Sequence, residues 1–143
     1  MPILAVLKHF VMLTKLHPVL VNFTAALIPV SWASDLLARF FKNDPLRSTA
    51  WWTLLYATLI TPLTVVTGWL FWMPDDNGAA GMAVHKWLGT MLGVLLLVLF
   101  SWRWKFYSRQ QPVSWGYLAF GLVFVAALII QGHLGGSQVF SSM

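Results

Sequence analysis

Apolar residues run through this chain in four long stretches, and the charged and turn-forming residues gather between them. A helix needs about 20 apolar residues to cross the hydrocarbon core of a bilayer, and four stretches reach this length with Lys or Arg only near their ends. They lie at about 19–38, 51–73, 84–104 and 114–133. The pattern predicts four transmembrane helices in a single domain that covers residues 1–143.

Connections of roughly ten residues between these stretches require neighbouring helices to run in opposite directions. We therefore expect an all-α fold, an integral membrane four-helix up-and-down bundle. Residues 1–16 are also rich in apolar side chains but include Lys8 and Lys15. This segment is predicted to form a short N-terminal helix at the membrane interface, ahead of the first span.

Composition supports a membrane protein. The chain is 59% hydrophobic and only 9% charged, whereas soluble domains contain roughly 25% charged residues. The net charge of +5 does not indicate nucleic-acid binding, because the basic residues flank the apolar stretches instead of forming a cluster. The chain has no cysteine, which excludes disulfides, iron–sulfur ligation and thiolate metal sites.

Basic residues also predict the orientation. The two loops that follow the first and third spans hold six of them, and the opposite side holds three. The six are Arg39, Lys42, Arg47, Arg103, Lys105 and Arg109, and the three are Lys8, Lys15 and Lys86. The positive-inside rule then places the two loops in the cytoplasm and both termini on the outer side of the membrane.

Three histidines fall at helix ends on that outer side. His17 begins the first span, His85 begins the third and His133 ends the fourth. Neutral imidazole is a good ligand for haem iron, zinc or copper, so these three residues are the candidate cofactor and metal ligands. His9, in the N-terminal segment, is a weaker candidate at the same level.

A b-type haem is the cofactor that fits this arrangement best. The first and third helices are diagonal in the bundle, so His17 and His85 can ligate one iron from opposite sides, with His133 as the competing partner. Gly89 and Gly93 share the face of His85 and leave space for a neighbouring helix or a flat cofactor. Two alternatives stay open: a three-histidine copper or zinc site, and histidines that only make interfacial hydrogen bonds.

Other polar residues inside the spans have simpler interpretations. Asp35 is a carboxylate within a span, which is a functional hypothesis by default, but Arg39 follows one turn later and predicts a structural ion pair between the two. The amides of Asn22 and Gln131 can bond a cofactor, a quinone or another helix. The sequence holds no nucleotide-binding motif and no catalytic acid–base or nucleophile set, which favours a non-catalytic subunit over an enzyme.

The segments "LHPVLVNFTAAL", "TGWLFWMPDD", "HKWLG" and "GHLGG" resemble the DUF2231 family of four-helix bacterial membrane domains over about residues 16–137. Related domains are joined to Rieske iron–sulfur modules, and the recurrent histidines of the family look like b-haem ligands. The resemblance implies such roles for His17, His85 and His133. Asn22 and Thr24 stand where the family typically has a second histidine and a proline, so the resemblance implies at most one bis-histidine haem.

The sequence thus predicts a membrane-bound subunit that carries b-type haem. It would pass electrons between a quinone or another membrane redox subunit and an extracytoplasmic redox protein. The main alternative is a cofactor-free assembly subunit of a larger membrane complex. A third hypothesis is a small transporter in which Asp35 lines the transport path, but the sequence shows no clear internal repeat of the kind common in transporters.

Overall fold

The computed structural model describes residues 2–70 and 79–141, and the side chains of 16–70 and 83–136. The described residues form four helices: α1 (Pro2–Phe41), α2 (Asp44–Leu70), α3 (Ala79–Ser108) and α4 (Trp115–Ser141). Each contains an apolar stretch of at least 22 residues, long enough to cross a hydrocarbon core of about 30 Å. The predicted all-α membrane bundle with four spans is confirmed.

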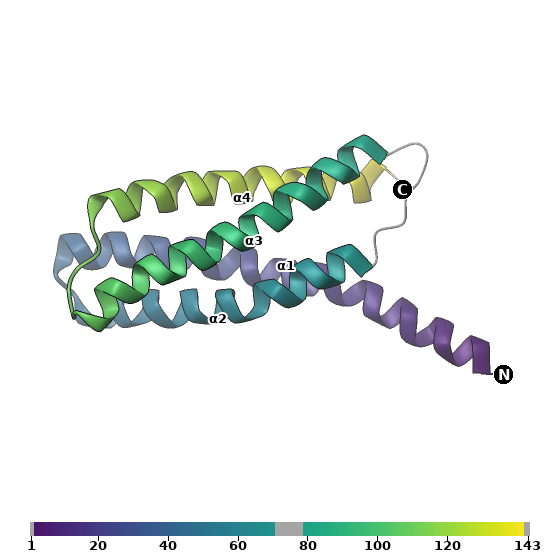
Figure 1. Ribbon diagram of the computed structural model, residues 1–143, viewed down its shortest axis with the longest axis horizontal. Helices are drawn as coiled ribbons and strands as arrows, with labels where there is room; N and C mark the ends of the chain where they lie inside the picture. The colour runs from purple at the N-terminus through teal and green to yellow at the C-terminus, as the bar shows by residue number, and fades with distance from the viewer. Residues whose placement is uncertain (1, 71–78, 142–143) are drawn as a thin grey trace.

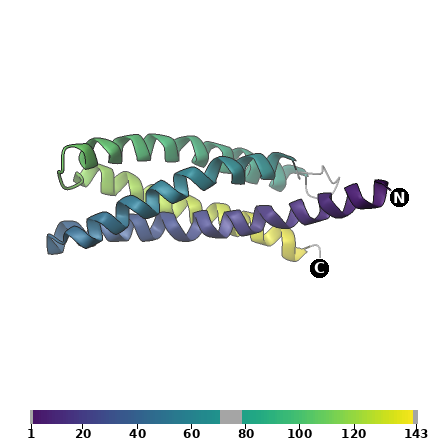
Figure 2. The ribbon, with the colours of Figure 1, turned by 90° about the horizontal axis from the view of Figure 1, so that it is seen from below.

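The helices form an up-and-down bundle in which each helix packs against the next one in a ring (Figure 1). Among the described residues, the diagonal pairs α1–α3 and α2–α4 make no close backbone contact. The connections 42–43 and 109–114 lie at one end, here called the loop end (Figure 2). At the other end, here called the terminal end, α2 and α4 finish and α3 starts.

Side-chain caps fix the connections at the loop end. Asn43 Oδ1 accepts a hydrogen bond from the backbone N–H of Leu46 at 3.0 Å and caps α2. Ser114 Oγ accepts one from the N–H of Tyr117 at 3.1 Å and caps α4. Lys42 ends α1 in the left-handed conformation (φ 50°). The helices therefore extend into the basic segments, and the connections are two and six residues long instead of roughly ten.

The first helix differs from the prediction. Residues 1–16 were expected to form a separate helix, but residues 2–15 are the first part of one continuous 40-residue helix. Pro18 lies inside this helix; it removes one backbone hydrogen bond without ending the helix. At about 1.5 Å per residue, α1 is about twice as long as the bilayer core is thick. Its N-terminal part accordingly projects beyond the other helices (Figure 1).

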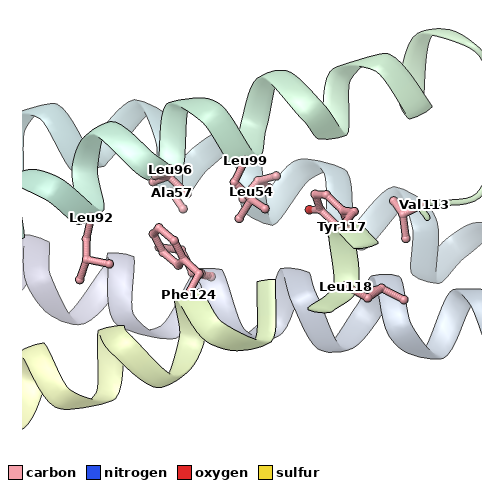
Figure 3. Packing of buried hydrophobic residues seen from close by; sticks show 10 residues of the cluster. Leu54, Ala57, Leu92, Leu96, Leu99, Val113, Tyr117, Leu118 and Phe124 are labelled. Atoms are coloured by element: carbon pink, nitrogen blue, oxygen red, sulfur yellow. The ribbon is translucent and has the colours of Figure 1, made fainter. Parts of the chain in front are cut away.

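A compact apolar core lies between the helices. Its side chains come from all four helices and from the second connection, and Figure 3 shows most of them pointing into the space between the ribbons. The buried members are Ile28, Leu54, Ala57, Leu92, Leu96, Leu99, Val113, Tyr117, Leu118 and Phe124. Large apolar residues such as Val123 and Ile129 are about two-thirds exposed, at 67% and 68%. An apolar outer surface is the one expected of a bundle that faces lipid.

Small residues bring α1 and α2 close together, and this is the most extensive helix pair. Ala57 is fully buried, and Ser31 Oγ donates a hydrogen bond to the Ala50 carbonyl at 2.8 Å. Thr64 follows Ala57 by seven residues on α2, and its hydroxyl lies 3.5 Å from that of Thr24 on α1. Small and hydroxyl side chains of this kind let membrane helices approach closely and bond to one another.

Gly121 of α4 provides the space for Trp32 of α1. The indole N–H donates to the Leu118 carbonyl at 2.9 Å, and a Cβ at Gly121 would lie 2.5 Å from the ring. We expect Gly121→Ala to displace the indole and lower the free energy of unfolding by about 1–3 kcal/mol. Gly116→Ala is the control, since its Cβ would make an ordinary 3.8 Å contact with Trp102. Thermal unfolding in detergent checks this; equal midpoints for the two variants would contradict it.

Candidate functional site

The three predicted histidines lie at the terminal end on three different helices. His17 and His85 are near the start of the membrane-spanning parts of α1 and α3, and His133 is near the end of that of α4. The His17 and His85 side chains are half-buried, whereas that of His133 is exposed. His9 is part of α1, but its side chain lies outside the described residues. The histidines thus differ in how far they enter the bundle.

His17 is held against α2 through its Nδ1 atom. This atom lies 3.0 Å from the Thr64 carbonyl oxygen and 3.1 Å from Thr67 Oγ1. Because a carbonyl only accepts hydrogen bonds, Nδ1 donates and the other ring nitrogen, Nε2, keeps its lone pair. Gly68 makes room for the ring, since a Cβ there would lie 2.9 Å from His17 Cε1. A backbone acceptor on one nitrogen is typical of a histidine that ligates a metal through the other.

His85 is held against α4 by Gln131 and Gly135. The Gln131 side-chain nitrogen donates to the His85 backbone carbonyl at 2.8 Å and lies 3.5 Å from the ring Nε2. A Cβ at Gly135 would lie 2.7 Å from His85 Cε1. His85 Nδ1 and Gln131 Oε1 are buried without a hydrogen-bond partner among the described residues. Such orphaned atoms are costly, so these two atoms can still engage a further polar group.

His17 and His85 form a pair. Their helices are diagonal, and both side chains are half-buried at the terminal end of the bundle. One nitrogen of His17 keeps its lone pair, and one nitrogen of His85 has no partner among the described residues. Two imidazoles from different helices are a ligand set that suits a haem iron inside a helical bundle.

His133 does not join this pair. Among the described side chains, no group of three His, Asp or Glu residues could hold a metal ion. The three-histidine copper or zinc site, predicted as an alternative, is therefore not formed by His17, His85 and His133 in this arrangement. Asn22 is exposed, while Gln131 contacts His85 and so belongs to the site.

The glycines expected to admit a helix or a cofactor face neighbouring side chains. A Cβ at Gly89 would lie 2.7 Å from the side-chain nitrogen of Gln131. A Cβ at Gly93 would lie 3.1 Å from Val65 and 3.5 Å from Thr61. The small residues of α3 therefore serve contacts with α4 and α2.

A second buried polar cluster lies nearer the loop end. Arg103 Nε donates to Asp35 Oδ2 at 2.8 Å, and these side chains are 0% and 2% exposed. Arg103 Nη2 donates to the Arg47 carbonyl at 3.2 Å, while Nη1 is buried without a partner among the described residues. The hydroxyl of Tyr117 also interacts with the Asp35 carboxylate. The ion pair connects α1 to α3, the same diagonal helices that supply the two histidines.

The predicted Asp35–Arg39 ion pair is wrong. Arg39 donates instead to the Val113 carbonyl, and its guanidinium lies 4.7 Å from the centre of the Trp115 ring. The reason is the rotation of α1, which turns Asp35 into the bundle and lets Arg39 reach the start of α4. A carboxylate buried in a membrane bundle needs a partner that is buried with it, and Arg103 is that partner.

Sequence reasoning missed Arg103, although the pattern held a signal for it. Three buried apolar residues precede it on α3 at spacings of four and three, and Arg103 follows four residues after the last. They are Leu92, Leu96 and Leu99. Positions with this spacing share one helix face, so the face that enters the core continues to Arg103.

Comparison with known proteins agrees with this architecture. No curated protein and no solved structure gives a significant match to the chain. The profile of the family described as "Predicted membrane protein (DUF2231)" matches residues 14–143, which include all four spans, both buried clusters and His133. The chain therefore belongs to the DUF2231 family of predicted membrane proteins.

Proposed function

We propose that His17 and His85 would hold the iron of one b-type haem and that the chain is an electron-transfer subunit of a membrane complex. The imidazole pair at the terminal end carries the proposal. The two rings are half-buried and come from diagonal helices at the same end of the bundle. His133 is left out of the ligand pair because its side chain is exposed.

The donor atoms fit a haem iron. His17 donates from Nδ1 to a backbone carbonyl and keeps the Nε2 lone pair, and His85 has a buried ring nitrogen without a partner among the described residues. When bound, the haem supplies one-electron transfer. The chain's own residues fix the ring orientations through Thr64 and Gln131, and its apolar helices exclude water.

The proposed partners are a quinone or a membrane redox subunit on one side and an extracytoplasmic redox protein on the other. With these partners, the chain would lie in a bacterial cytoplasmic membrane with its terminal end outward. The exposed cations Lys42, Lys105 and Arg109 at the loop end support that orientation. Arg103 does not support this orientation, because its charge is buried and paired with Asp35.

One observation favours a second candidate, a cofactor-free assembly subunit of a larger complex. Each histidine ring rests on a glycine of the neighbouring helix, Gly68 for His17 and Gly135 for His85. Gln131 also covers the backbone carbonyl of His85. These contacts can equally be the packing of structural histidines at helix ends.

A dithionite-reduced minus oxidised absorbance spectrum of the purified protein tests the haem proposal. We expect a b-type α-band in the wild type and its loss in His17→Ala and His85→Ala, because each substitution removes one axial ligand. His133→Ala is the matched control, since it makes the same change at the same end of the bundle on an exposed residue. That variant should keep the band.

Two outcomes would contradict the proposal. A featureless wild-type spectrum after expression with ample haem would favour the cofactor-free assembly subunit. A band that persists in His85→Ala but disappears in His133→Ala would assign the ligand pair to other helices. Helical content measured by circular dichroism on the same samples separates ligand loss from unfolding.

A further inference from the structure

A shallow groove of about 510 Å³ runs along the outer face of α3. All of its lining residues belong to this one helix and recur at spacings of three and four, so they share a face. They are Val94, Leu97, Val98, Ser101, Trp102 and Lys105. The groove faces outward, where the four-helix arrangement places lipid.

Trp102 forms a fixed wall of this groove. Its ring packs edge-on against Tyr117 of α4 with centroids 6.0 Å apart and lies 6.2 Å from the Phe120 ring. Gly116 of α4 also lies beside the indole, since a Cβ there would make an ordinary 3.8 Å contact with it. Contacts with a second helix therefore set the shape of the groove before anything binds in it.

The groove changes from apolar to cationic along its length. Val94, Leu97 and Val98 are each at least half exposed and form the apolar part. The Ser101 hydroxyl donates to the Leu97 carbonyl at 2.8 Å, which satisfies its donor within α3. Lys105 is exposed at the loop end and lies about 16 Å along the helix from Val94, at about 1.5 Å per residue. It is the only charged residue among the lining side chains.

We propose that this groove binds one anionic phospholipid. The apolar part takes an acyl chain, and Lys105 takes the phosphate of the headgroup at the membrane surface. The match is one of shape and charge together: a ligand with an apolar tail and a negative head meets an apolar floor that ends in a cation. This inference is independent of the haem proposal, since the groove shares no residue with the histidine pair.

Charge also argues against a second copy of the chain in the groove. Two copies in one membrane share the same orientation, so a twofold contact along α3 would bring the two Lys105 side chains together. Like charges across such an interface oppose association. An anionic lipid meets the same lysine with the opposite charge.

Native mass spectrometry with added lipid tests the proposal. The protein in detergent is titrated with phosphatidylglycerol or phosphatidylcholine, and the bound lipid per chain is counted. Lys105→Gln should weaken phosphatidylglycerol binding about fivefold, the effect expected for one lysine near an anionic headgroup, and leave phosphatidylcholine unchanged. Lys42→Gln is the matched control, because it removes an exposed charge at the same end but outside the groove.

Ser101→Phe supplies a second, uncharged test. The bulky ring fills the groove between Val98 and Lys105 on an exposed position, so both lipids should bind less tightly while the fold stays intact. Equal lipid binding by Lys105→Gln and Lys42→Gln would overturn the proposal. A wild-type spectrum dominated by two chains, with dimers lost on Ser101→Phe, would show that a second copy occupies the groove.

Discussion

Replacing Arg103 with methionine is expected to lower the free energy of unfolding by about 3–5 kcal/mol. The Asp35 carboxylate is 2% exposed and would lose its buried counter-ion, while the Tyr117 hydroxyl stays beside it. A buried charge that loses its counter-ion retains its desolvation cost without the compensating attraction. Unfolding in detergent with added denaturant, followed by circular dichroism, measures the loss.

Removing both charges should be much less harmful than removing one. Asp35→Leu combined with Arg103→Met replaces the ion pair by apolar groups, so we expect the double variant to recover most of the stability lost in Arg103→Met. Arg109→Met is the control, because it removes an exposed arginine just beyond the end of the same helix. If the double variant lost as much as the two single losses added together, Asp35 and Arg103 would not be coupled.

Arg103→Lys separates charge from geometry. Arginine bonds Asp35 through Nε and the Arg47 carbonyl through Nη2, and a lysine has one nitrogen for both tasks. An intermediate stability is therefore expected. A lysine variant as stable as the wild type would mean that only the charge matters at this position.

The four spans were predictable because bilayer thickness fixes the length of apolar sequence that a helix needs. The helix ends were less predictable, since they depend on caps that apolar counting ignores. Asn43 and Ser114 cap α2 and α4 and shorten both described connections. The continuity of α1 was also not predicted, because Pro18 lies inside the helix without ending it.

The buried polar cluster was only half predicted. Asp35 stood out because a carboxylate within a span is unusual, but its partner was sought locally along the chain. The partner comes from α3, and finding it requires the rotation of two helices about their axes. That rotation was encoded in the apolar periodicity of α3, whose core face runs through Leu96 and Leu99 to Arg103.

The prediction of the histidine site was limited in the same way, because it also depends on helix rotation. Alternating helix directions were enough to place His17, His85 and His133 at one end. Which of them enter the bundle depends on helix rotation. On α4, inward positions continue to Gln131 and Gly135, which both contact His85. His133 lies two residues from each of them, about 200° around the helix, and so faces outward.

A large effect on both stability and the histidine site is expected at Gly135. Its hydrogen faces the His85 ring, and a Cβ would lie 2.7 Å from His85 Cε1 and 3.2 Å from Nδ1. Gly135→Val therefore forces the imidazole out of its place, because α4 cannot withdraw without losing its own packing on α3. We expect a loss of about 1–3 kcal/mol in the free energy of unfolding, as for other overpacked sites.

Gly136→Val is the matched control for this substitution. It adds the same side chain one residue later, where no atom lies within 4 Å of the Cβ position among the described residues. Both variants introduce the same β-branched residue into the same turn, so their intrinsic helix propensities cancel in the comparison. The difference between the two therefore reports the displacement of His85 alone.

The two valine variants also distinguish the haem proposal from the cofactor-free assembly subunit. If His85 is a haem ligand, Gly135→Val should lose the reduced-minus-oxidised α-band and Gly136→Val should keep it. If His85 is only a packing residue in a cofactor-free subunit, Gly135→Val should lower stability while neither the variant nor the wild type shows a band. Equal stability of the two valine variants would contradict the close packing of His85 on α4, on which the orientation of the imidazole pair depends.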